Sequence, residues 1–170
     1  MKAINAIRMG GVEVLPLVEG GKGVSVSNGA SCGAWAASGG VGTFSAVNAD
    51  SYDSDGKPIP QVYHGKTRRE RHEELVRYAI NGAIAQAKRA WDLAGGKGRI
   101  HANILWEMGG AERVARGMLE GARGLIHGIT CGAGMPYRLA DIARDYGIFY
   151  YPIVSSARAF NALWRRAYSK

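Results

Sequence analysis

Residues 14–48, VLPLVEGGKGVSVSNGASCGAWAASGGVGTFSAVN, decide how the rest of the chain is interpreted. An apolar run at Val14–Val18 is followed by a glycine-rich break at Glu19–Gly23, a small-residue segment at 30–38 and a second apolar run at 41–47. This order predicts a strand, a glycine loop, a helix and a second strand, which together form a βαβ unit. The glycines directly follow the first strand, where parallel α/β folds bind their ligands.

The glycine loop is compatible with a ligand-binding role, although a simpler explanation exists. Three of the four residues 20–23 are glycines, which allows the backbone to approach a ligand and expose its N–H groups. A glycine-rich turn without a ligand explains the same spacing, because short glycine patterns recur by chance. The loop lacks the G-x-G-x-x-G fingerprint, and no acidic residue ends the second strand, so a nicotinamide cofactor is disfavoured.

Length and charge restrict the possible classes of protein. The 170 residues suffice for a single domain with a sizeable core. The net charge is +8, but no stripe of interleaved aromatic and basic residues accompanies it, so we expect no nucleic-acid binding. The sequence has no apolar run of the roughly 18 residues that a membrane span needs, and its start lacks a signal-peptide core. We therefore expect a cytoplasmic protein that does not bind membranes.

Neither cysteines nor acidic residues predict a metal site. Cys32 and Cys131 lie far apart without metal-like spacing, and we expect both to be free thiols in a reducing compartment. Residues 49–66 form a polar, turn-rich loop insertion that begins with an Asp-rich segment. This segment lacks the terminal Glu and the full ligand spacing of a calcium loop.

The remainder of the chain alternates between strands and helices. Strands are expected at 15–19, 42–47, 99–105, 124–130 and 149–154. Helices are expected at 29–38, 67–94, 111–120, 136–146 and from Ser155 or Ser156 onwards. Residues 1–13 are expected to form a lead-in with one short helical turn. The alternation implies a parallel sheet with right-handed crossovers, either as an open doubly wound sheet or as part of a (β/α)8 barrel.

Four segments in this order resemble the nitronate monooxygenase family, formerly called 2-nitropropane dioxygenase. They are EGGKG at 19–23, GGVGTFSAVNA at 39–49, Asn103 within a strand, and GITCGAGMP at 128–136. The resemblance implies an α/β fold of the parallel (β/α)8 TIM-barrel type. In this interpretation residues 1–170 are a single domain, the N-terminal portion of an incomplete barrel with about five of eight βα units.

The resemblance also implies a cofactor, FMN, and a set of residues that bind it. These residues are Gly20, Gly21, Lys22 and Gly23 against the flavin, Asn103 bonded to its ring, and Gly132, Ala133 and Gly134 on the substrate side. Backbone N–H donors near the ring would stabilise the anionic reduced flavin. The chain departs from the family at Lys22, where Met is common, and at Glu19, where Gln or Ala is frequent.

Length is the larger departure from the family. Family members continue through three more strands, which carry the phosphate-binding loops and the catalytic histidine. None of His64, His72, His101 and His127 matches that histidine, so the catalytic residue is unknown, and His101 and His127 are expected to be structural. Five strands cannot close an eight-stranded barrel, so the chain is expected to need the remaining barrel half or an oligomer.

Three functions follow from these features. The first is an FMN-dependent monooxygenase that oxidises a small alkyl nitronate with dioxygen. The second is an FMN-dependent enoyl-thioester reductase of lipid or polyketide synthesis, since those enzymes share the two glycine loops. The third is a non-catalytic subunit that requires a C-terminal half.

Overall fold

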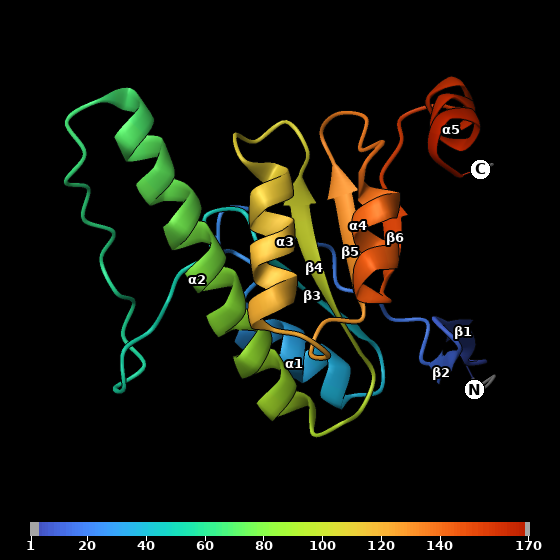
Figure 1. Cartoon of the computed structure of the whole chain (residues 1–170). Coiled ribbons are helices and arrows are strands. Elements are labelled where there is room, and N and C mark those ends of the chain that lie inside the picture. Colours follow the sequence, from blue (N-terminus) through green and yellow to red (C-terminus); the bar gives the residue numbers. More distant parts are fainter. Residues whose placement is uncertain (1–3, 169–170) are drawn as a thin grey trace.

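The computed structural model describes residues 4–168 of the chain (Figure 1). The strands are β1 (Ile7–Met9), β2 (Val12–Val14), β3 (Val41–Ser45), β4 (Arg99–Leu105), β5 (Gly128–Gly132) and β6 (Phe149–Pro152). The helices are α1 (Gly29–Ala37), α2 (Arg68–Ala94), α3 (Ala111–Gly121), α4 (Leu139–Tyr146) and α5 (Ala157–Leu163), followed by the π-helical turn η1 (Trp164–Tyr168). Strands and helices alternate from α1 onwards, as the sequence predicts.

The main sheet is parallel and its strands follow the order β3-β4-β5-β6. Each helix from α1 to α4 packs against the next one, and the four form a layer over one face of the sheet (Figure 1). A doubly wound sheet would carry helices on both faces and reverse its strand order, so this arrangement disfavours that alternative. The expectation of a parallel α/β fold is confirmed.

The expected first strand, residues 15–19, is reduced to a single bridge between Val18 and Val41. Val41 N donates to Leu17 O and Glu19 N donates to Val41 O, both at 2.8 Å. The ladder then breaks, because Thr43 N donates to the Glu19 side chain, at 3.1 Å from Oε2. The prediction of a five-residue strand at 15–19 was therefore wrong in extent. The Glu19 carboxylate accepts the Thr43 N–H in place of the backbone carbonyl that would have continued the ladder.

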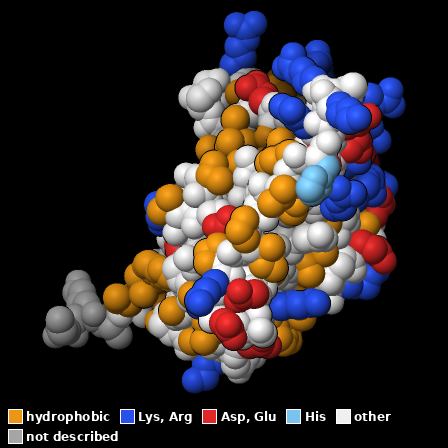
Figure 2. Space-filling view, turned by 90° about the vertical axis from the view of Figure 1, so that its left-hand side faces the viewer, with side chains coloured by type: hydrophobic (Ala, Val, Ile, Leu, Met, Phe, Trp, Pro, Cys, Tyr) orange, Lys and Arg blue, Asp and Glu red, His pale blue; other side chains and the backbone are white. Residues whose placement is uncertain are grey.

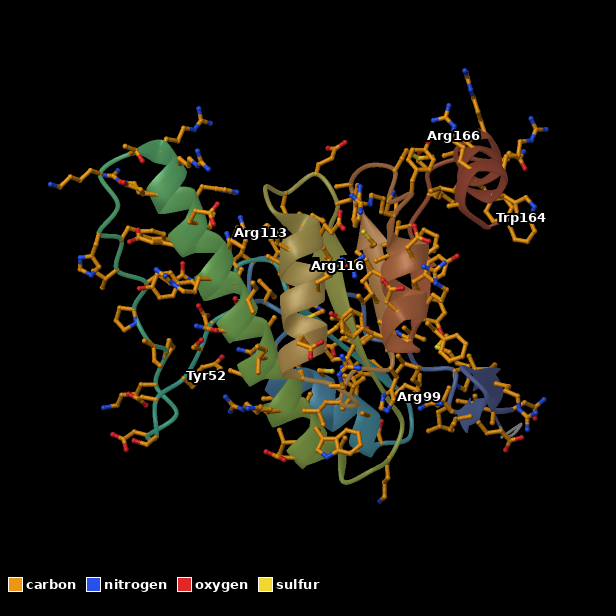
Figure 3. The ribbon with its side chains drawn as sticks, viewed as in Figure 1. Tyr52, Arg99, Arg113, Arg116, Trp164 and Arg166 are labelled. Carbon is orange, nitrogen blue, oxygen red and sulfur yellow. The ribbon has the colours of Figure 1, made fainter. Side chains whose placement is uncertain are left out.

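The N-terminal segment forms a hairpin where a helical turn was expected. β1 and β2 pair antiparallel, and Gly10 and Gly11 make the turn with φ of 58° and 79°. Positive φ at both turn residues matches the twist of a two-residue hairpin, which explains the Gly-Gly pair. Arg99 Nη2 donates to Gly10 O at 2.8 Å, which holds the hairpin at the amino end of β4 (Figures 1 and 3).

The core lies between the sheet and the helix layer. It is rich in alanine, and α2 contributes Val76, Ala79, Ala83, Ala87, Ala90 and Ala94. Gln86 is a buried polar residue of α2 whose Nε2 donates to Asp50 O and whose Oε1 accepts from Gly29 N, each at 2.6 Å. This one side chain therefore ties α2 to α1 and to the start of the 49–66 loop.

Helix ends follow local signals, while some strand ends do not. Thr67 and Glu70 form the predicted capping box of α2, and Gly95 ends the helix in the left-handed conformation. The strand predicted at 124–130 lies at 128–132, because Gly124 adopts a φ of 81° in a turn. The strand predicted at 149–154 ends at Pro152, and the helix predicted from Pro136 begins at Leu139.

Exposed ion pairs join the helices of the outer layer. Arg113 of α3 points toward α2 and forms two hydrogen bonds with Glu73, at 2.8 and 2.6 Å (Figure 3). Arg116 of α3 pairs with Glu112 and with Asp145 of α4. Within residues 4–168, no helix combines the length and the apolar character that crossing a membrane requires.

Candidate functional site

The face of the sheet opposite the helices is lined by polar side chains. Successive strand residues point to opposite faces, so Ile100, Ala102 and Ile104 of β4 enter the core while His101 and Asn103 lie on the other face. We name two rows across this face from the strand register. The upper row is Ser45, Asn103, Thr130 and Tyr151, and the lower row is Thr43, His101, Gly128 and Phe149. Bulky branched residues normally fill the interior of a TIM barrel, so the polar upper row indicates a site.

The glycine loop after Glu19 lies directly on Asn103. A Cβ built on Gly21 would overlap the Asn103 side chain, whereas one built on Gly20 would have open space around it. Lys22 N donates to Ser27 Oγ at 2.7 Å and Ser27 N donates to Lys22 O at 3.1 Å, which closes the loop into a turn. The structure thus brings the predicted loop and the predicted asparagine together.

The second predicted glycine loop follows β5 and pairs with the residues after β4. Trp106 N donates to Gly132 O and Glu107 N donates to Ala133 O, both at 2.9 Å. Ala133 has a φ of 50° and Gly134 a φ of 110°, so the chain turns sharply as it leaves the strand. Gly132 is two residues beyond Thr130, about 7 Å along the strand. Asn103 and residues 132–134 therefore lie toward the carboxyl ends of the paired strands β4 and β5, and Gly21 contacts Asn103 from the loop that follows the bridge at Val18.

Sequence reasoning missed the partner of Asn103. Thr130 lies opposite Asn103 in the β4–β5 register, and its Oγ1 donates to Asn103 Oδ1 at 3.1 Å. Asn103 is only 6% exposed, and in this bond the Oδ1 atom of its amide faces Thr130. Alternation along GITCG would have placed Thr130 and Gly132 on one face, but the register with β4 is not visible in the local sequence.

His101 is a buried, neutral histidine in the lower row. Its ring stacks on Tyr151 at a centroid distance of 4.9 Å, over Gly128, where a Cβ would contact both rings. Burial, together with the nearby His127 and Arg99, lowers the pKa of His101 to about 4. Its Nδ1 and the hydroxyl of the adjacent Thr43 are buried and have no hydrogen-bond partner among residues 4–168. The histidine is uncharged at neutral pH.

His127, Cys32 and Cys131 lie in surroundings that are typical of structural residues. His127 Nδ1 accepts a hydrogen bond from Ile100 N at 3.0 Å, and burial lowers its pKa to about 4. Cys32 and Cys131 are free and buried, and burial raises the pKa of each thiol to about 12. Both thiols therefore stay protonated at neutral pH and are poor nucleophiles.

A separate surface hollow of about 590 Å³ lies between the 49–66 loop and α2. None of the residues that line it belongs to the two glycine loops. Its carboxylates already have partners, since Glu74 accepts from His64 N and Gly65 N at 3.1 Å and Glu73 pairs with Arg113. Figure 2 shows this side of the molecule, where apolar side chains mix with charged ones and Lys and Arg gather toward the top. The hollow is open and internally satisfied, so we do not assign it a ligand.

The Asp-rich start of the 49–66 loop folds around its own backbone. Asp53 Oδ1 accepts from Asp55 N at 3.0 Å and from Lys57 N at 2.9 Å, which is the bonding of an Asx turn. Among the described residues, no three His, Cys, Asp or Glu side chains are grouped so that they could hold a metal ion.

The arrangement on the upper row suits a planar ligand with polar edges. The backbone of Gly21 lies beside the hydrogen-bonded amide of Asn103, and hydroxyl groups lie on the neighbouring strands. Lys22 in the same loop is exposed. Comparison of the sequence with protein-family models and with curated proteins gives no match. The function is therefore inferred from this geometry together with the four motifs.

Proposed function

We propose that the chain supplies the ring-binding wall of an FMN-dependent oxidoreductase of the nitronate monooxygenase type. Its substrates would be small alkyl nitronates, and dioxygen would be the oxidant. The observation that carries the proposal is the contact of Gly21 with Asn103, together with the place of residues 132–134 at the carboxyl end of β5, the strand that pairs with β4. Ligands of parallel α/β folds bind at this edge.

The residues of this edge fit a flavin ring. Gly21 leaves no room for a side chain above Asn103, so the surface beside the amide is bare backbone. Asn103 would hold a polar edge of the ring, and the loop N–H groups would face developing negative charge. When bound, FMN would supply the two-electron oxidation and reduction chemistry. Lys22, whose Nζ lies 3.2 Å from Gly20 O, would add a positive charge at the loop.

The chain alone offers only part of a catalytic site. His101 lies one row below Asn103 and is uncharged at neutral pH, so we do not assign it as the catalytic base. The phosphate site of a TIM barrel usually follows its seventh and eighth strands. We propose that a remaining barrel half or an oligomer supplies both functions.

Exposed apolar side chains support this need for a partner. Leu105, Phe149 and Ile153 are 38%, 49% and 61% exposed, and they follow the face and edge of the sheet that the helices leave uncovered. A closed barrel would bury such positions in its interior.

Titration of the purified chain with FMN tests the proposal. We expect binding, seen as a change in flavin absorbance and fluorescence, and a loss of binding in Gly21→Ala, because the new methyl group displaces Asn103. Urea unfolding of Gly21→Ala is the control, since the variant should still unfold cooperatively while its FMN binding is lost. A wild-type chain that takes up no FMN contradicts the proposal.

Turnover assays separate the alternative reactions. A nitronate with dioxygen is the substrate pair of the monooxygenase, whereas NADPH with a crotonyl thioester would reveal a reductase. Activity that appears only after a separately expressed C-terminal half is added would identify a split enzyme.

A further inference from the structure

The contact between Thr130 and Asn103 determines which groups the amide can offer to a ligand. The two residues are opposite each other on β5 and β4, and the Thr130 hydroxyl donates to Asn103 Oδ1 at 3.1 Å. A threonine hydroxyl has one proton to donate, and an amide oxygen can only accept. The bond therefore directs the carbonyl branch of Asn103 toward β5 and leaves the NH2 group on the other branch.

Gly21 restrains the same side chain from a second direction. Its Cα lies so close to Asn103 that a Cβ would overlap the Asn103 Cβ and lie 3.0 Å from Oδ1. The Thr130 hydroxyl and the Gly21 backbone therefore hold the Asn103 side chain from two directions, and in the observed arrangement its Oδ1 faces Thr130.

We propose that Thr130 is a positioning residue that holds the Asn103 amide in place, with its NH2 group offered to a planar ligand whose edge carries a hydrogen-bond acceptor. This inference rests on the proposed function and extends it, because it names the edge of the ring that the protein reads. A carbonyl oxygen or an unprotonated ring nitrogen would accept from the Asn103 NH2 group. A ring edge that presents an N–H at that point would meet a second donor and bind more weakly.

Three variants of the whole chain test the inference by FMN titration. Thr130→Val keeps the size of the side chain but removes the donor, and we expect it to weaken FMN binding about tenfold. Thr130→Ser restores the hydroxyl and should recover most of the affinity. Thr43→Val is the matched control, because Thr43 lies in the lower row on the same face and its hydroxyl makes no hydrogen bond to residues 4–168.

A second readout reports the amide directly. The side-chain ¹⁵N resonance of Asn103 should show slow proton exchange in the wild type and in Thr130→Ser, and faster exchange in Thr130→Val. A wild type that binds FMN with a Thr130→Val variant equal to Thr43→Val in both measurements overturns the inference alone. A wild type that binds no FMN overturns the proposed function, and this inference with it.

Discussion

The protonation of His101 is expected to make the fold sensitive to acid. The unfolded state binds a proton on this histidine below its ordinary pKa of 6.5, while in the folded state the pKa is about 4. Between these values the unfolded state holds more protons, so the free energy of unfolding falls as the pH falls. Above pH 6.5 both states are neutral and the contribution is constant.

The size of the effect follows from this shift in pKa. A difference of about 2.5 pKa units corresponds to about 3 kcal/mol, of which about 2.5 kcal/mol is lost by pH 4.5. His101 is 2% exposed, so solvent screens little of this penalty. His127 titrates in the same window and its charge lowers the pKa of His101, so both histidines contribute to the acid sensitivity of the wild type.

Urea unfolding at pH 7.5, 6.5, 5.5 and 4.5 at constant ionic strength measures the effect. His101→Phe keeps an aromatic ring against Tyr151 but removes the titrating group, and its unfolding free energy should decline less steeply than that of the wild type below pH 6.5. His64→Asn, at an exposed position of the 49–66 loop, serves as the control and should follow the wild type. If His101→Phe is as acid-sensitive as the wild type, the assignment of acid sensitivity to this buried ring is refuted.

Substitutions at three further positions test the contacts and the cap of α2. Gln86→Leu should cost about 2–4 kcal/mol in urea unfolding, because it leaves Gly29 N and Asp50 O without their bonds to the side chain. Thr67→Ala should cost about 1 kcal/mol through loss of the helix cap, and Thr67→Ser should restore it. Arg113→Ala should change the unfolding free energy by less than about 1 kcal/mol, since both partners of its ion pair are about half exposed, and a larger loss would contradict this.

Local signals in the sequence were sufficient for most of the fold. β4 occupies 99–105 as predicted, because its alternation of polar and apolar residues starts after Gly98 and ends before Trp106, where the alternation breaks. The start of α2 was predictable from the Thr67 capping box, which involves residues three apart. The hairpin at 7–14 was missed even though Gly10 and Gly11 carry the turn signal, since its strands are only three residues long.

The site was predictable only where a motif marks it. Asn103 and the two glycine loops were proposed by resemblance; the structure brings Gly21 against Asn103, and their binding of FMN stays a prediction. Thr130 and Tyr151 were not identified, because their place beside Asn103 depends on the register of three strands that are distant in sequence. The extent of the 15–19 strand was wrong for a related reason, since the bond from Thr43 N to the Glu19 side chain depends on tertiary structure.

The outer edge of β3 holds both ends of the first glycine loop through hydrogen bonds. Thr43 N donates to the Glu19 carboxylate and Ser45 N donates to Ser27 O at 2.8 Å, so both ends of the loop are fastened to consecutive outward amides of one strand. Substitutions within the intervening segment, 20–26, leave both amides satisfied, and position 21 has to stay glycine because a Cβ there overlaps Asn103. The amides of Thr43 and Ser45 therefore hold the two ends of the loop in place. Other loop sequences with glycine at position 21 can be placed between them to change which ligand the loop binds.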